Sequence, residues 1–150
     1  MNKMGIGVVL ALVLSLVMVL GSVSAVEAGP PSERLIIERD ATYPTGSNPV
    51  KLSGSASWSK FNIYAVSVKW QIQVGSYPNA QWVDIEEDGR DYGVRTPQGS
   101  LTLDKHYDVE TTTQFRFTCQ VYDRKGNPIS DRKGGYKSWQ ISVDPPPSSP

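Results

Sequence analysis

The chain has one histidine, one cysteine and one dense acidic segment, and any chemistry would have to be built from these groups. A nucleophilic hydrolase needs a base beside its nucleophile, and His106 is the only histidine that could serve. The sequence also has no Gly-x-Ser-x-Gly motif of the kind that presents a nucleophilic serine. We therefore interpret His106 as a surface residue and expect no enzyme and no cofactor.

The acidic segment, residues 84–91, reads Asp-Ile-Glu-Glu-Asp-Gly-Arg-Asp and includes an expected turn at Asp88-Gly89. Its spacing resembles that of a calcium loop, but the twelfth position, which needs a bidentate glutamate, is Arg95. The EF-hand interpretation therefore fails. A looser surface calcium site and a solvated acidic turn stay open as alternatives. Paired carboxylates for glycoside hydrolysis could come from the same segment, but nothing indicates a cleft between them.

A second charged group lies near the C-terminal end of the chain, in two neighbouring turns. It comprises four cations and one ring that we select as candidate binding residues: Arg124, Lys125, Arg132, Lys133 and Tyr136. Such a group could contact an anionic surface polymer, and the tyrosine could stack on a sugar. The plainer alternative is that turns carry charge because they are exposed to water.

Strands must position these groups, because apolar residues recur at every second place from residue 35 onward. Three rows are expected to face inward: Val50, Leu52, Gly54, Ala56 and Trp58; then Val66, Val68, Trp70, Ile72 and Val74; then Phe115, Phe117, Cys119 and Val121. Turn residues separate strands at intervals of about ten residues, which predicts seven or eight antiparallel strands in a sandwich or barrel.

The ends of the chain differ from this middle part. Lys3 precedes an uncharged stretch from residue 4 to residue 26, followed by small residues, so residues 1–28 are predicted to be a signal peptide. The stretch is also long enough for an uncleaved N-terminal anchor. Residues 29–34 are expected to be a linker, 35–144 the domain and 145–150 a Pro/Ser-rich tail. Either N-terminal interpretation predicts an extracellular or cell-surface location.

Several short motifs carry a family resemblance: Trp70-Gln71, Trp82-Val83-Asp84-Ile85, and the strand from Gln114 to Asp123 with Gly126-Asn127 after it. Together they resemble the immunoglobulin-like repeats of bacterial and archaeal surface proteins. The resemblance implies an immunoglobulin-like sandwich in which Trp70 is the core tryptophan, Trp82 the second tryptophan and Cys119 the sixth-strand cysteine.

The sequence departs from the antibody-type pattern at two places. Gly54 and Ala56 occupy the positions where a second-strand cysteine would be expected, and Cys119 is the only cysteine, so no internal disulfide can form. Phe117 replaces the tyrosine whose hydroxyl ties the corner in that subfamily. Stability must then come from packing, and the expected structural core is Trp70, Trp82, Phe115, Phe117, Cys119 and Trp139.

Charge limits the range of partners. Fifteen basic and fifteen acidic side chains cancel, so the chain has no overall field that would draw it to nucleic acid. We expect an extracellular, non-catalytic module for adhesion, surface assembly or spacing through protein contacts. The alternative is a small carbohydrate-binding module that uses exposed Trp and Tyr rings. The partner is expected to be a surface protein or polysaccharide, with membrane contact only through an uncleaved N-terminal segment.

Overall fold

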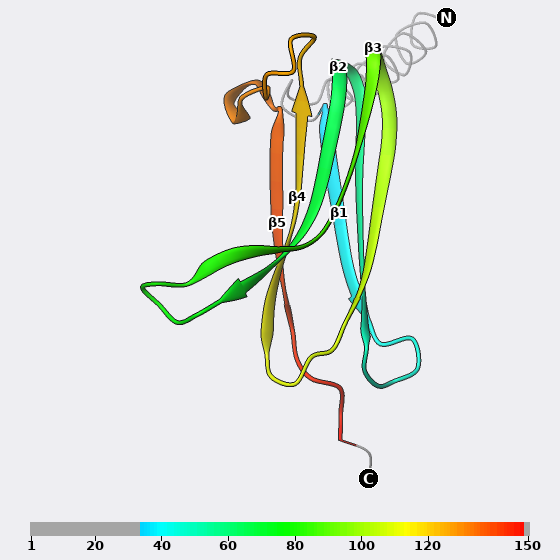
Figure 1. Ribbon diagram of the computed structural model, residues 1–150. Coiled ribbons are helices and arrows are strands. Elements are labelled where there is room, and N and C mark those ends of the chain that lie inside the picture. Colours follow the sequence, from blue (N-terminus) through cyan, green and yellow to red (C-terminus); the bar gives the residue numbers. More distant parts are fainter. Residues whose placement is uncertain (1–33, 149–150) are drawn as a thin grey trace, which may run out of the picture. The chain divides into compact units, whose positions relative to one another are not determined.

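The computed structural model describes residues 34–148. The predicted signal peptide or anchor, residues 1–28, and all of the linker before residue 34 lie outside the described residues. Five strands run along the chain, with one short 3-10 turn before the last of them (Figure 1): β1 Leu35–Thr42, β2 Val50–Val74, β3 Gln81–Tyr107, β4 Thr113–Tyr122, η2 Asp131–Lys133 and β5 Tyr136–Val143.

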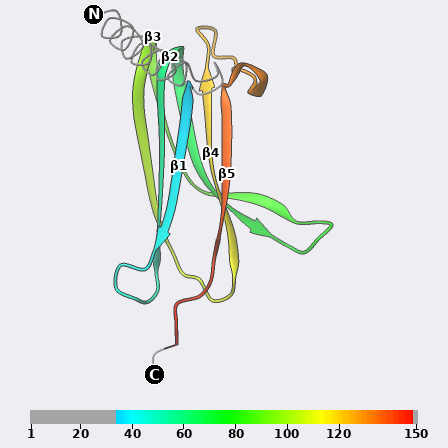
Figure 2. The same cartoon turned by 180° about the vertical axis from the view of Figure 1, so that it is seen from behind.

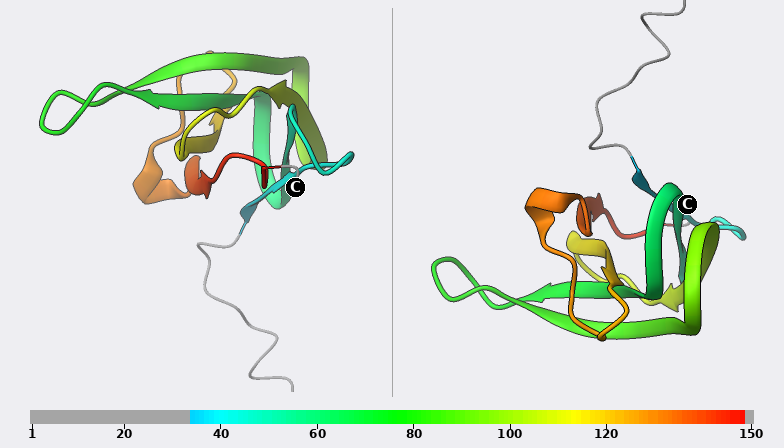
Figure 3. Two further views of the ribbon diagram at one scale, coloured as in Figure 1. Left: turned by 90° about the horizontal axis from the view of Figure 1, so that it is seen from below. Right: turned by 90° about the horizontal axis from the view of Figure 1, so that it is seen from above.

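All strand pairs are antiparallel and belong to one sheet, in the order β1-β2-β4-β5 with β3 also paired to β2. The first half of β2 pairs with β1 and with the end of β3. Its second half pairs with β4 and with the start of β3. Because one long strand serves both parts, the sheet curls back on itself (Figures 2 and 3). The prediction of an all-β, antiparallel fold is confirmed, and the curled sheet is compatible with a sandwich.

The structure has five strands where the sequence predicts seven or eight. The difference arises because β2 and β3 bend without breaking. Register shifts between Ser59 and Ile63 mark the bend in β2, where Lys60 adopts a left-handed backbone (φ 53°). The expected turn at Asp88-Gly89 is wrong: both residues lie inside β3 and pair with Val68 and Ser67. Their composition is typical of a turn, but continuous pairing with β2 keeps these residues extended.

The interior is formed by the alternating rows. Trp70, Phe115, Phe117 and Cys119 are completely buried. The Trp70 indole Nε1 donates a hydrogen bond across the interior to the Leu103 carbonyl (2.9 Å). All buried apolar side chains of the described part lie between Leu35 and Val143.

Gly54, one of the two positions where a second-strand cysteine would be expected, leaves no room for a side chain. A Cβ atom placed on Gly54 would overlap the ring of Phe117. The Phe117 ring in turn packs against Trp70, with ring centroids 5.2 Å apart. In this part of the interior an aromatic ring therefore packs directly on bare backbone.

Two of the six expected core residues are not in the core. Trp139 is 50% exposed, because β5 is the last strand of the described sheet and pairs only with β4 there. Arg39 covers part of its ring, with the guanidinium carbon 3.9 Å from the ring centroid. Trp82 is half-buried and pairs with the exposed Gln73, so its ring lies on the outer face of the sheet.

Candidate binding surfaces

The five predicted binding residues are brought together by the connection between β4 and β5. Arg124, Lys125, Arg132 and Lys133 are exposed, and Tyr136 is half-buried at the start of β5. The turn is shaped by Asp123, whose carboxylate accepts hydrogen bonds from the backbone N–H groups of Lys125 and Asn127 (2.8 and 2.9 Å). The Asp123 carboxylate is thus hydrogen-bonded to the backbone of its own turn, and the cations of the turn are exposed to solvent.

Three further cations lie at the same end of the domain, and sequence reasoning missed them. The Arg34 carbonyl accepts a hydrogen bond from Ser59 N–H (3.0 Å), next to Lys60 in the bend of β2. The Arg95 side chain donates to Asn62 (2.7 Å), from the bend of β3. Figure 3 views the domain along the strands from either end. We call the seven exposed cations the basic end: Arg34, Lys60, Arg95, Arg124, Lys125, Arg132 and Lys133.

A hairpin projects from the domain at the junction of β2 and β3 (Figure 1). β4 stops pairing with β2 at Ile72, so residues 73–82 form a two-stranded ribbon that has no other sheet neighbour among residues 34–148. We call this hairpin, residues 72–83, the arm. Three large apolar side chains on it are exposed: Val74 by 51%, Tyr77 by 95% and Val83 by 45%. Val74 was expected to face the core, and it extends past the strands that would cover it.

The base of the arm is held by a polar network on the outer face. Asp84 accepts hydrogen bonds from Lys69 and Gln71, both at 2.6 Å. Gln71 accepts one from Arg116 (2.8 Å), whose guanidinium carbon lies 4.4 Å from the Trp82 ring centroid. The hydrogen bond from Lys69 and then that from Gln71 lower the pKa of Asp84. The bond to Asp84 likewise raises the pKa of Lys69.

Beside this network lies an open depression of about 480 Å³, lined by Ser67, Lys69, Glu87, Asp88, Gly89 and Tyr122. Its two acids face cations: Glu87 lies 3.3 Å from Lys69, and Asp88 lies 2.9 Å from Arg90. The depression therefore offers hydrogen-bonding groups, paired charges and one aromatic ring, that of Tyr122.

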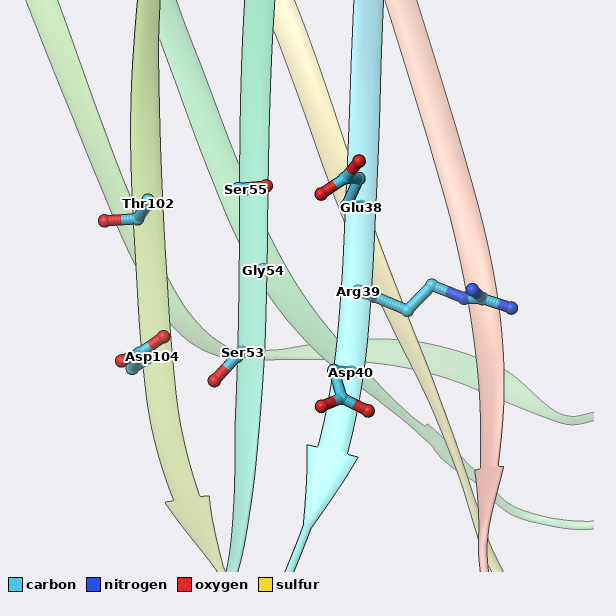
Figure 4. Close-up of a pocket in the computed structure, with 8 residues that line it drawn as sticks. All are labelled: Glu38, Arg39, Asp40, Ser53, Gly54, Ser55, Thr102 and Asp104. Atoms are coloured by element: carbon cyan, nitrogen blue, oxygen red, sulfur yellow. The ribbon is translucent and has the colours of Figure 1, made fainter.

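A second depression, of about 240 Å³, lies on the outer face formed by β1, β2 and β3 (Figure 4). Hydroxyl groups line its floor, with Glu38 and Asp40 on one side and Asp104 on the other. Arg39 points away from it, toward β5. Asp104 is paired with Lys51 at 3.1 Å. The surface is a shallow polar face, and the nearby His106 is exposed on β3, opposite Lys51.

The acidic segment 84–91 is strand rather than turn, so its carboxylates are divided between different neighbours. Asp84 and Glu87 face Lys69, while Glu86 pairs with Lys105 at 3.0 Å. Within residues 34–148, no three His, Cys, Asp or Glu side chains converge in a way that could hold a metal ion. The loose calcium site considered from the sequence therefore gains no geometric support from the described part of the chain.

The fold and these surfaces define an antiparallel all-β domain whose distinctive features are a projecting arm and a basic end. The sequence matches no protein-family model and no curated protein. None of the helical segments within the described range 34–148 is long and apolar enough to cross a membrane.

Proposed function

We propose that this chain is an extracellular, non-catalytic, immunoglobulin-like module that works in adhesion, surface assembly or spacing through protein contacts. The observation that carries the proposal is the arm, which extends Val74, Tyr77 and Val83 beyond the covered part of the sheet. Tyrosine at such a position supplies a large contact area at a low cost in conformational entropy, and it is enriched at binding hot spots.

The immunoglobulin-like assignment is supported by the way in which the two long strands divide. If each half of β2 and β3 counts as one strand, seven strands form two groups. One group contains β1 with the start of β2 and the end of β3, and the other contains the remaining halves with β4 and β5. Trp70 then falls on the third strand and Cys119 on the sixth, in agreement with the resemblance found in the sequence.

Affinity capture from an envelope fraction of the source cells tests this proposal, with the chain from residue 32 onward immobilised. A variant carrying Val74→Ser and Tyr77→Ser is expected to lose retained protein partners by roughly thirtyfold or more, because truncating a hot-spot residue costs about 2 kcal/mol or more. Ile36→Ser is the matched control, since Ile36 lies on β1 and is as exposed as Val74 (51%). Equal retention by the wild type and the arm variant would refute the protein-contact function.

A second candidate, a small carbohydrate-binding module, is supported by Trp82 and Tyr122 on the polar outer face. Rings beside hydrogen-bonding side chains are suited to stacking on sugars. This candidate predicts that the domain is retained on insoluble polysaccharides and that Trp82→Ala abolishes the retention. Val74→Ser should leave it unchanged. Retention that depends on Val74 and not on Trp82, or no retention at all, argues against sugar binding.

A further inference from the structure

We propose that the basic end is a docking surface for an anionic membrane. This inference goes beyond the proposed protein contacts and uses a different surface, because the arm and the basic end share no residue. It rests on three observations: cations that form no ion pair with any other described residue, an exposed apolar side chain beside one of them, and the point at which the chain enters the domain.

The first observation is an excess of cations over acids among the described residues of this end. None of the seven cations takes part in an ion pair within residues 34–148, where the ion pairs involve Lys51, Lys69, Arg90 and Lys105. The seven cations lie in four segments: Arg34 and residues 59–63, 91–96 and 123–135. Within the described range these segments contain three acids, Asp91, Asp123 and Asp131. Asp91 and Asp123 accept hydrogen bonds from backbone N–H groups of their own turns. The surplus charge is therefore positive and faces outward.

The second observation is Val94, which lies next to Arg95 and is 64% exposed. The bend that presents it contains Gly93, whose left-handed backbone (φ 64°) turns the chain outward. Exposed apolar residues next to cations are typical of surfaces that bind at the boundary between lipid headgroups and acyl chains. A soluble polyanion would gain nothing from an exposed valine, which favours a membrane over a polymer.

The third observation is the entry point of the chain. Arg34, the first described residue, belongs to the basic end. The uncharged stretch ends at residue 26, so seven residues separate it from Arg34. Seven residues reach at most about 25 Å. If that stretch is retained as an anchor, the tether holds the basic end near the membrane and raises its effective concentration there. If it is cleaved, the charges and Val94 act alone.

Cosedimentation with vesicles tests the proposal. The chain from residue 32 onward is used, because it forms one compact unit and because a tether would by itself hold the protein at the membrane. Vesicles of 30% phosphatidylglycerol and 70% phosphatidylcholine are compared with pure phosphatidylcholine at low salt. We expect binding to the anionic vesicles only, weakening as salt is raised. Absence of any preference for the anionic vesicles would overturn the proposal.

Variants identify the surface. Lys125→Gln with Lys133→Gln should weaken vesicle binding roughly thirtyfold, given about 1 kcal/mol for each basic residue near an anionic surface. The matched control is Ser47→Glu with Thr111→Glu, which changes net charge equally on exposed loops outside the four segments of the basic end. Equal weakening by this pair would show that overall charge, not the basic end, controls binding, and would overturn the proposal.

Two further measurements separate the membrane from other partners. Val94→Ser should weaken vesicle binding several-fold, and soluble polyphosphate should compete poorly. Strong competition together with no effect of Val94→Ser would replace the membrane with a soluble polyanion and overturn the proposal. The arm variant Val74→Ser with Tyr77→Ser should bind vesicles like the wild type, so failure of the protein-contact function would not affect this result. The substituted side chains are exposed, and an unchanged near-ultraviolet circular dichroism spectrum will verify folding.

Discussion

The arm shares strands β2 and β3 with the rest of the sheet, which we call the body. The two regions differ in how far other parts of the chain cover their apolar side chains. Val68 and Val74 lie in one alternating row of β2, and they are 0% and 51% exposed. β4 pairs with β2 beside Val68 but stops at Ile72. Alternation in a sequence thus identifies the apolar face of a strand, while burial depends on whether another part of the chain reaches that face. The arm is apolar surface that the rest of the described domain leaves open.

Thiol reactivity should show the largest difference between the two regions. Burial raises the pKa of Cys119 to about 12, so at pH 8 the folded protein holds almost no thiolate and shields the sulfur. In the variant Val74→Cys the same molecule also carries an arm thiol. We expect the arm thiol to react with Ellman's reagent at least about 10³ times faster, because Cys119 must wait for the body to open.

The wild type supplies the control for that experiment, since its single thiol should show only the slow phase in native buffer and a fast phase in denaturant. A fast reaction of Cys119 in the native wild type would mean that β4 opens as easily as the arm. The distinction between a closed body and an open hairpin would then be lost.

Truncation of an aromatic ring should separate the regions in stability. Phe117→Ala removes a completely buried ring and leaves a cavity, which costs about 3–5 kcal/mol of the free energy of unfolding. Tyr77→Ala removes a ring that is 95% exposed and should change that free energy by less than about 0.5 kcal/mol. Urea denaturation of both variants measures the difference. Comparable losses would indicate that Tyr77 packs against the body in solution.

A substitution at Gly54 should destabilise the body less than Phe117→Ala does, and it adds atoms to the interior instead of removing them. Gly54→Ala adds a methyl group where the Phe117 ring already lies, so overpacking should cost about 1–3 kcal/mol. If that contact is the cause, Gly54→Ala should cost much less when combined with Phe117→Leu than it does alone. Denaturation of the two single variants and the double variant completes the cycle. Additive losses would place the strain elsewhere.

The sequence predicts the interior of the body well, because the rows around Trp70 and Phe117 alternate without interruption and the structure buries them. It predicts strand ends poorly. Asp88-Gly89 has the composition of a turn, but the ladder to Val68 and Ser67 holds it extended. A turn signal is local, whereas a ladder depends on a partner that one segment cannot reveal.

The binding surfaces follow the same distinction. The sequence groups the four cations of the β4–β5 connection because they are neighbours along the chain. Lys60 and Arg95 join them only through the bends of β2 and β3, which carry no strong signal beyond Gly93. Trp82 was assigned to the core by resemblance, yet its pairing with Gln73 places it on the outer face. A register shift of one residue, as at the bulge between Trp70 and Gln71, is enough to move a side chain from one face of the sheet to the other.

The smallest effect on stability is expected at the base of the arm, where Asp84 accepts hydrogen bonds from Lys69 and Gln71. The pKa of Asp84 in the folded protein lies below its ordinary value of 3.8. Its contribution to stability is therefore complete above that value and is lost as the pH falls through the lowered pKa. Since both charged groups are partly exposed to solvent, the contribution should be below about 1 kcal/mol.

Comparison of the wild type with Asp84→Asn tests this contribution, because the substitution replaces the carboxylate by an amide of similar shape. The wild type should be slightly more stable at pH 5, and the difference should shrink as the pH falls below 3.8 and through the lowered pKa. Amide hydrogen exchange resolves where the loss occurs. Faster exchange in residues 72–83, with unchanged exchange around Trp70, would place the network's effect on the arm. Uniform acceleration would instead assign Asp84 to the stability of the body, and the arm would not open as a separate unit.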